Sequence, residues 1–347
     1  MIQKKGKGKI VDNHAIKYNF GNTQWQGGDL EKLKAHLVDH MDLISHYPER
    51  EAETLVRLLS RRLEVGENEV MVTDGATGAL HLIAGLTPSA VSLVLPPTNK
   101  EFYHALTRAK HTVRIQEDVK ELSKLELDGV EMLWLSNPNN PDGRFFSRRS
   151  LLSLLREHPD LIVIVDLSLA NFVVEDNIKA SDIKKYPNLI VVSSFSKQYN
   201  IPGLRVGYMV ANEERIKRFH QNYTPRCVGT LGIEASRYIL LHPAQFTIPI
   251  RKWLRDSLDL ADELNKLDGV TILYGAPPFF ILQLEVGTAD ELSKFLLSKY
   301  SIKVGIASDD IDLKDNEIRI CGFSNARANE LIIEAISEYL IGKQDRD

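Results

Sequence analysis

The sequence feature that most restricts the fold of this chain is an alternation of short apolar segments with longer amphipathic ones. The apolar segments are the candidate strands Val70–Thr73, Val91–Leu95, Thr112–Ile115, Glu131–Leu135, Leu161–Val165, Leu189–Val192 and Val206–Val210. Helical periodicity fills the intervals, at Gly78–Leu86, Glu101–Lys110, Ser147–Glu157 and Glu213–Tyr223. Strands that alternate with helices indicate a mostly parallel sheet, and strands this apolar need cover on both faces. The pattern predicts an α/β fold with a three-layer α/β/α large domain.

Beyond Thr224 the pattern changes to longer helical segments and fewer strands. The candidate helices and strands are Gly229–Leu241, Pro243–Leu267, Phe279–Leu284, Ala289–Tyr300, Glu317–Ile320 and Asn325–Ile341. This predicts a second, smaller α+β domain. We expect an N-terminal arm and helix at 1–40 that packs with the small domain, a large domain at 41–224 and a small domain at 225–347.

Composition argues for small-molecule chemistry inside the cell. The formal net charge of −4 offers no general attraction for nucleic acid or an anionic membrane. The two cysteines, Cys227 and Cys321, do not suggest a disulfide scaffold. The basic start Met1–Lys9 leads into no apolar core, and the apolar stretch Leu161–Val174 is too short for a bilayer span. We therefore expect a cytoplasmic protein without a transmembrane helix.

Unusual polar residues follow four of the predicted strands directly. They are Gly75 to Gly78, Asn137 to Gly143, Asp166, and Ser194 to Lys197. In open α/β sheets, ligands bind outside the carboxyl ends of the strands. The sequence thus predicts a ligand site at this edge of the sheet.

Two of these positions have a specific chemical interpretation and a structural alternative. Gly75-Ala76-Thr77 opens a helix whose free N–H groups can bind a phosphate, although a tight turn capped by Asp74 or Thr77 explains the same residues. A carboxylate at Asp166, after a buried strand, is costly unless a cation compensates it. Asp166 could instead cap the next segment. The dinucleotide fingerprint G-x-G-x-x-G is absent.

The segment Ser193 to Tyr208, with Ser-Phe-Ser-Lys197 and Pro202-Gly203-Leu204-Arg205, resembles the Schiff-base segment of fold-type-I pyridoxal-phosphate enzymes. It is most similar to the aminotransferase class I/II branch, which contains histidinol-phosphate aminotransferases and threonine-phosphate decarboxylases. The resemblance implies that Lys197 forms an imine with pyridoxal 5'-phosphate and that Asp166 keeps the pyridine nitrogen protonated. It assigns the cofactor phosphate to Gly75, Ala76, Thr77, Ser194, Ser196 and Arg205.

The resemblance implies further roles, each with a plainer alternative. Asn140, in a turn similar to the family's Asn-Pro-Asn-Asn-Pro-Thr-Gly, would hydrogen-bond the ring's 3-oxygen. Phe102 would stack on the ring, or else pack in a helix core. Arg319 would bind an acidic group of the substrate, or lie exposed on an edge strand. Tyr47 would reach the cofactor of a neighbouring subunit in a homodimer, or belong to an extended turn.

The chain also departs from the family's pattern. Leu169 stands where many relatives have a tyrosine that stabilises the ring's 3-oxygen, and Asp142 replaces a threonine. The segment Phe20 to Thr23 differs from the family's entrance segment, and Asn22 is our candidate substrate-binding residue within it. These differences bear on which substrate is used.

Our preferred interpretation is a homodimeric aminotransferase that acts on a small amino acid or amino-phosphate compound with a keto-acid acceptor. A threonine-phosphate decarboxylase-like enzyme is the alternative, and a non-catalytic ligand-binding protein on the same fold is a third. We expect no metal site. His36 and His40 lie one helical turn apart, as zinc ligands do, but no third ligand is near in the sequence.

Overall fold

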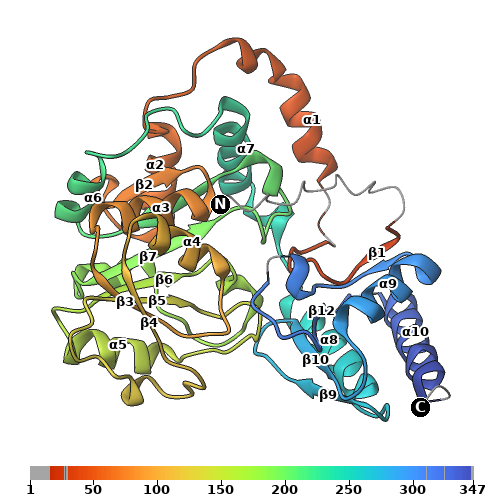
Figure 1. Cartoon of the computed structure of the whole chain (residues 1–347). Coiled ribbons are helices and arrows are strands. Elements are labelled where there is room, and N and C mark those ends of the chain that lie inside the picture. Colours follow the sequence, from red (N-terminus) through yellow and green to blue (C-terminus); the bar gives the residue numbers. More distant parts are fainter. Residues whose placement is uncertain (1–15, 27, 29, 310, 324, 345–347) are drawn as a thin grey trace, which may run out of the picture.

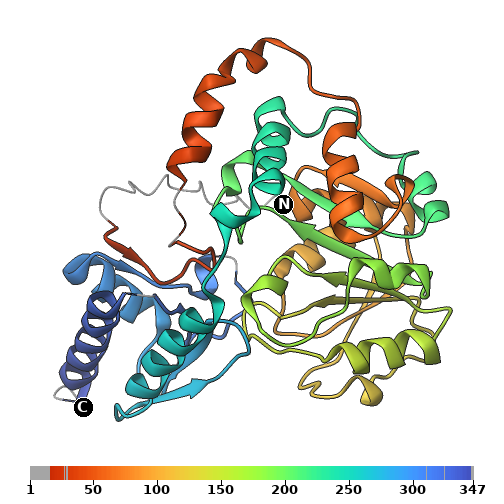
Figure 2. The same cartoon turned by 180° about the vertical axis from the view of Figure 1, so that it is seen from behind.

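The central sheet has seven strands in the order β2-β8-β7-β6-β5-β3-β4. The computed structural model describes residues 16–26, 28, 30–309, 311–323 and 325–344, and Figures 1 and 2 show the sheet beside a smaller part built on α8 to α10. The strands are β2 (Val70–Thr73), β3 (Val91–Val94), β4 (Thr112–Ile115), β5 (Met132–Ser136), β6 (Ile162–Asp166), β7 (Leu189–Ser194) and β8 (Gly207–Val210). Each predicted strand of the large domain is present, within two residues at either end.

Four neighbouring pairs are parallel, and β8 runs antiparallel to both β2 and β7. The segment between β7 and β8 contains only the short 3-10 helix η7 (Pro202–Leu204) and no crossover helix. Without such a helix the chain returns antiparallel to β7. The sheet is therefore mostly parallel, as predicted.

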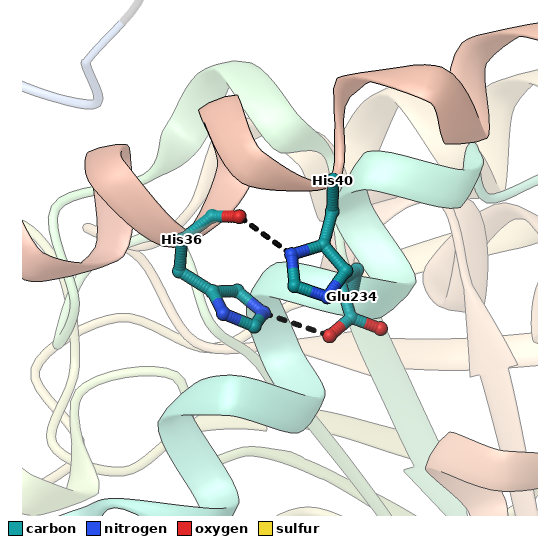
Figure 3. A group of neighbouring side chains, drawn as sticks. All are labelled: His36, His40 and Glu234. Carbon is teal, nitrogen blue, oxygen red and sulfur yellow. Dashed lines mark hydrogen bonds and ion pairs between the residues drawn. The ribbon is translucent and has the colours of Figure 1, made fainter.

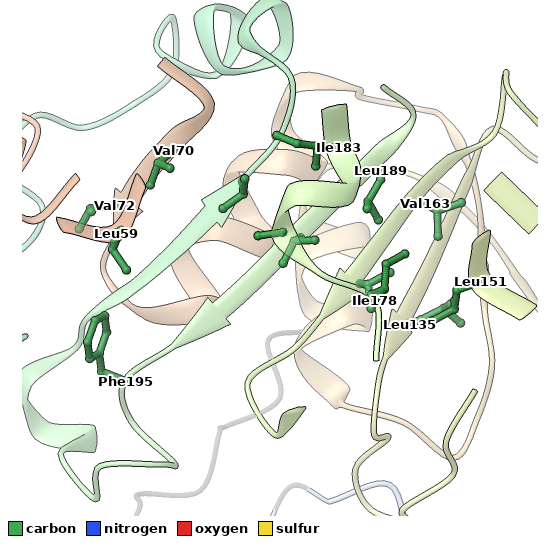
Figure 4. Close-up of a cluster of buried hydrophobic side chains, with 14 of the residues drawn as sticks. Leu59, Val70, Val72, Leu135, Leu151, Val163, Ile178, Ile183, Leu189 and Phe195 are labelled. Carbon is green, nitrogen blue, oxygen red and sulfur yellow. The ribbon is translucent and has the colours of Figure 1, made fainter. Parts of the chain in front are cut away.

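Helices cover both faces of the sheet. Helices α2 (Glu53–Leu63), α5 (Arg148–Glu157) and α7 (Thr230–Leu241) cover one face, and α3 (Gly75–Leu86), α4 (Lys100–Arg108) and α6 (Glu213–Phe219) cover the other. Successive strand residues alternate between the two cores: Val163 packs on the first face, shown in Figure 4, and Ile164 on the second. Both are fully buried. Burial on both faces explains the continuously apolar strands.

The smaller part has its own hydrophobic core. Its elements are α8 (Ile250–Leu264), β9 (Val270–Leu273), β10 (Phe279–Leu284), α9 (Ala289–Tyr300), β12 (Glu317–Cys321) and α10 (Ala326–Gln344). Strands β12, β10 and β9 form an antiparallel sheet, and β1 (Tyr18–Asn19) pairs with β11 (Ile302–Lys303). Helix α1 (Glu31–Asp39) packs against α7, and not against the smaller part as expected.

In the part of the chain that the structure describes, no helix combines the length and hydrophobicity needed to cross a bilayer.

Short 3-10 helices complete the chain. They are η2 (Met41–Ser45), η3 (Glu67–Glu69), η4 (Leu122–Lys124), η5 (Ala170–Phe172), η6 (Ala180–Lys184), η8 (Pro243–Phe246) and η9 (Ala307–Asp309).

One predicted helix is divided in the structure. The expected helix Pro243–Leu267 consists of η8 followed by α8, with Pro249 at the cap position of α8. Proline has no N–H to continue a helix and restricts the residue before it, so the helix begins after Pro249. Helix α7 lies beyond the predicted limit at 224, yet its residues Ile233, Ala235 and Ile239 belong to the core of the large sheet. The domain limits stay a prediction.

Substitution of Gly207 should destabilise the protein because the start of α3 lies against it. A Cβ at this position would come 2.3 Å from the carbonyl carbon of Gly75 and 2.6 Å from the nitrogen of Ala76. We expect Gly207→Ala to lower the free energy of unfolding by about 1–3 kcal/mol, the usual effect of overpacking, measured by urea denaturation. Gly203→Ala is the control, since no atom lies within 4 Å of its added Cβ. Equal stability of the two variants would contradict the packing argument.

Candidate active site

The polar ends of the strands lie in line across the sheet. Ser136 of β5 pairs with Asp166 of β6, and Asp166 pairs with Val192 of β7. Gly207 of β8 pairs with both Ser194 of β7 and Thr73 of β2. The register therefore brings together residues that are far apart in the sequence, at the edge where ligands bind in such sheets.

A cavity of about 270 Å³ opens at this edge. It is lined by eight residues that the sequence predicted: Ala76, Thr77, Asn140, Asp166, Ser194, Ser196, Lys197 and Arg205. Leu169, noted as a departure, also lines it. The prediction missed Gln24, Asn99, Glu101, Ser136, Pro138, Ser168 and Pro202. Asn99 and Glu101 follow β3, and the same rule of strand ends could have identified them.

The first turn of α3 and Arg205 form one wall of the cavity. Helix α3 begins at Gly75, whose φ is +87°. A Cβ on Gly75 would lie 2.4 Å from Nη2 of Arg205, so a side chain here would displace the guanidinium. Arg205 is exposed and its Nη2 donates to the Asp74 carbonyl at 3.4 Å. Free helix N–H groups beside an arginine suit a phosphate group.

Asp166 is only 6% exposed at the end of β6. Its Oδ1 accepts a hydrogen bond from the Ser168 main chain at 2.9 Å. Burial raises the pKa of the carboxyl, against the opposing effects of Ser168 and the Lys197 charge. The chain's own groups thus stabilise the negative charge of Asp166 only in part. A cationic N–H group in the cavity would stabilise it further.

Lys197 lies on the loop that follows β7. Burial, followed by the Arg319 charge, lowers the pKa of its amine to about 8. About a tenth of the amine is therefore unprotonated at pH 7, far more than for an ordinary lysine, and the unprotonated form is the one that acts as a nucleophile or a general base. The main chain of Lys197 accepts a hydrogen bond from Trp25 N at 3.1 Å, which ties the N-terminal segment to this loop.

Arg319 reaches the site from β12 of the smaller part. Its Nη1 donates to Asn140 Oδ1 at 2.5 Å and its Nη2 donates to the Gly21 carbonyl at 2.6 Å. The side chain is 5% exposed, and burial lowers its pKa to about 10. Among the described residues, no partner accepts a hydrogen bond from its buried Nε. A guanidinium with a donor to spare suits an anionic group of a substrate.

Five predicted site residues do not line the cavity: Gly75 and Arg319, described above, and Phe102, Asn22 and Tyr47. Phe102 is fully buried in the core beneath α4, with its ring 5.9 Å from that of Trp134, which is the packing alternative given above. Asn22 forms local hydrogen bonds with Gln24, which does line the cavity. Tyr47 is 89% exposed, with the Arg226 guanidinium 5.6 Å from its ring centre. The roles proposed for these residues stay predictions.

Two of the three departures from the family's pattern, Leu169 and Asp142, have a local explanation. Leu169 is buried in a cluster with Trp25, Phe172 and Trp253 beside the cavity. An apolar side chain fits this environment, where a phenol would need a hydrogen-bond partner. Asp142 Oδ1 accepts hydrogen bonds from Asn139 Nδ2 at 2.6 Å and from the Arg144 main chain at 3.0 Å. It thus fixes the turn that carries Asn140.

The model of the aminotransferase class I and II family matches residues 29–336, so the chain belongs to this family. A histidinol-phosphate aminotransferase of Staphylococcus carnosus is 30% identical over 245 residues, which cover 66% of this chain and 67% of the relative. The crystal structure of L-threonine-O-3-phosphate decarboxylase from Porphyromonas gingivalis is 40% identical, with a TM-score of 0.90, and the match covers 93% of this chain and 99% of that one. A Sinorhizobium meliloti histidinol-phosphate aminotransferase in complex with pyridoxal-5'-phosphate shares the fold, at 18% identity and a TM-score of 0.78, over 93% of this chain and 90% of that one.

These findings confirm the predicted family, the α/β fold, the cofactor and the enzyme class. The chain is a pyridoxal-phosphate-dependent enzyme of the aminotransferase family. The relatives divide between amino transfer and decarboxylation, which were the two reactions expected from the sequence.

The residues around the cavity fit pyridoxal phosphate. Asp166 would hold its ring nitrogen, Asn140 would hydrogen-bond its 3-oxygen, and Lys197 would bind its carbonyl carbon. Its phosphate would be held by Gly75, Ala76, Thr77, Ser194, Ser196 and Arg205. When bound, the cofactor accepts electrons from a bond that breaks at the substrate Cα. Lys197 would hold or donate a proton at that atom, and Arg319 would orient the substrate by an acidic group.

The lowered pKa of Lys197 can be tested in cofactor-free protein. A lowered pKa means that the amine loses its proton at a lower pH than an ordinary lysine. Modification by acetic anhydride, followed by mass spectrometry of the Lys197 peptide, should therefore rise through about pH 8. Arg319→Gln removes a positive charge and should move this midpoint upward. Arg327→Gln, a change at an exposed arginine of α10, should leave it in place; the same midpoint in both variants would contradict the assigned cause.

Proposed function

We propose that this enzyme decarboxylates a small amino acid that carries a phosphate group, as L-threonine-O-3-phosphate does. The observation that carries the proposal is the 40% identity to the Porphyromonas gingivalis decarboxylase over 93% of this chain. Leu169 lines the cavity at a position where many aminotransferases have a tyrosine, which also favours a specialised reaction.

The site offers separate places for the two anionic groups of such a substrate. Arg319, whose Nη1 reaches Asn140 in the wall of the cavity, binds one of them. A second cavity of about 400 Å³ shares Gln24 with the first and is lined by Lys17, Trp25 and Asn325, among others. Lys17 is the cation there that can bind the other anion. When both anionic groups are held, the substrate can place only one of its Cα bonds perpendicular to the plane of the cofactor ring. The perpendicular bond is the one that breaks.

Amino transfer is the second candidate function. The 30% identity to the Staphylococcus carnosus histidinol-phosphate aminotransferase favours it. An amine with a pKa of about 8 at Lys197 suits the proton movement that amino transfer requires. A keto-acid acceptor would then be the second substrate.

We also propose that the enzyme is a cytoplasmic homodimer with no nucleic-acid partner. Tyr47 is 89% exposed, and the nearby Val38 and Ile44 are each 66% exposed. Exposed apolar side chains on α1 and η2 support an interface that covers this segment and brings Tyr47 to the site of the partner subunit. Cys227 and Cys321 are unpaired, which is in keeping with a reducing compartment.

A substrate panel tests the choice between the two reactions. Holoenzyme should release carbon dioxide from O-phospho-L-threonine without any keto acid. Histidinol phosphate with 2-oxoglutarate as the acceptor is the parallel assay, read by mass spectrometry of both products. Amino transfer that depends on the keto acid, without release of carbon dioxide, would contradict the decarboxylase proposal and support the aminotransferase. Binding without turnover of either compound would favour a ligand-binding protein.

Loss of Arg319 should weaken substrate binding in whichever reaction is found. We expect Arg319→Gln to raise KM about 100-fold, since a buried charge-assisted contact contributes roughly 2–5 kcal/mol. Cofactor absorbance should persist, because Arg319 is not assigned to the cofactor phosphate. Arg327→Gln serves as the matched control on the exposed face of α10. An unchanged KM for Arg319→Gln would remove this residue from the substrate site.

A further inference from the structure

A second group of side chains with metal-binding chemistry lies outside the cavity. His36 and His40 are on α1, and Glu234 is on α7, 198 residues after His36. Figure 3 shows the three side chains turned toward one another across the two helices. No third ligand lies near the histidine pair in the sequence, and the packing of α1 on α7 provides one.

One hydrogen bond of the group prepares a ligand atom, and the other is given up on metal binding, because the proton that His36 Nε2 shares with Glu234 is released to solvent when that nitrogen binds the ion. His36 Nε2 lies 2.8 Å from Glu234 Oε1, and His40 Nδ1 lies 2.8 Å from the His36 carbonyl oxygen. A carbonyl oxygen can only accept, so His40 Nδ1 carries the proton and its Nε2 has a free lone pair. Protein zinc sites commonly use this arrangement, in which the second ring nitrogen donates to a main-chain carbonyl.

The surroundings of the group hold it in place. The side chains of His36 and Glu234 are only 21% and 13% exposed. Tyr238 stacks on the His36 ring with centres 4.4 Å apart, and Arg237 Nη1 donates to Glu234 Oε2 at 2.7 Å. Arg237 thus fixes one carboxylate oxygen and leaves Oε1 toward the histidines. Its positive charge opposes cation binding, so the affinity depends on the three ligands.

We propose that His36, His40 and Glu234 bind a late first-row divalent metal ion such as Zn²⁺. One ligand atom from each residue already lies within 4.8 Å of the others. With zinc bonds of about 2.0–2.1 Å, tetrahedral ligand atoms lie roughly 3.3 Å apart. The His36–Glu234 pair, at 2.8 Å, therefore opens slightly, and side-chain rotation brings together any ligand atoms that lie farther apart. Two histidines and a carboxylate leave a fourth position for water.

The metal would cross-link α1 to α7, away from the reacting atoms. Helix α1 leads into η2 and Tyr47, and Thr230 at the start of α7 donates its hydroxyl to the Leu43 carbonyl at 3.1 Å. The ion therefore stabilises the segment that carries Tyr47. Its role is structural, because none of its three ligands lines the cofactor cavity.

Zinc titration of the holoenzyme tests this site. Zn²⁺ affinity is measured by competition with a chromogenic chelator, and the visible spectrum of bound Co²⁺ reports the coordination. His40→Gln is the informative variant, because it removes one ligand and leaves the His36–Glu234 pair in place. His242→Gln is the matched control: its ring stacks on Tyr238 and its Nδ1 contacts the Tyr238 carbonyl at 2.8 Å, but it is not in the group of three.

We expect one equivalent of Zn²⁺ to bind wild type and His242→Gln, and His40→Gln to bind it at least tenfold more weakly. Zn²⁺ should raise the melting temperature of the first two proteins and not that of His40→Gln. All three should melt at similar temperatures without metal, which excludes misfolding as the cause. Absence of saturable binding to wild type, or equal binding to His40→Gln, would overturn the proposal and leave the three residues as a hydrogen-bonded helix contact.

Discussion

The buried carboxylate of Asp166 is the constraint on which the rest of this structure depends. It follows three fully buried apolar residues, Val163 to Val165, in a strand between two layers of helices, so water cannot solvate it freely. The chain compensates with the Ser168 main chain and the Lys197 charge, and the raised pKa shows that this is not enough. A deep carboxylate left short of positive charge forms a place that a cationic heterocycle can occupy.

The other features of the site follow from this placement. The parallel register brings Ser136 and the end of β7 to the level of Asp166. The antiparallel return of β8 sets Gly207 against the first turn of α3, beside which Arg205 lies. Burial lowers the pKa of Lys197, and the charge of Arg319, which comes from the smaller part, lowers it further. The pKa values of Asp166 and Lys197 are thus each affected by a residue on a different element.

Much of this could be read from the sequence, because strand ends and loop motifs are local signals. The strands and eight of the cavity residues were predicted in this way. Contacts between distant elements were not, because they depend on packing. The hydrogen bond from Arg319 to Asn140 joins residues 179 positions apart, and Glu234 meets His36 only when α7 packs on α1. Phe102 has the residue type expected of a stacking ring, but the pitch of α4 turns it into the core.

The aromatic cluster beside the cavity gives the enzyme an internal optical probe. Two of the three tryptophans, Trp25 and Trp253, lie 4.8 Å apart in this cluster with Leu169, which also lines the cavity. The third, Trp134, is buried in the sheet core. A chromophore held between Asp166 and Lys197 would lie beside this cluster and quench its indole emission. Intrinsic emission can therefore follow ligand entry in real time without any added label.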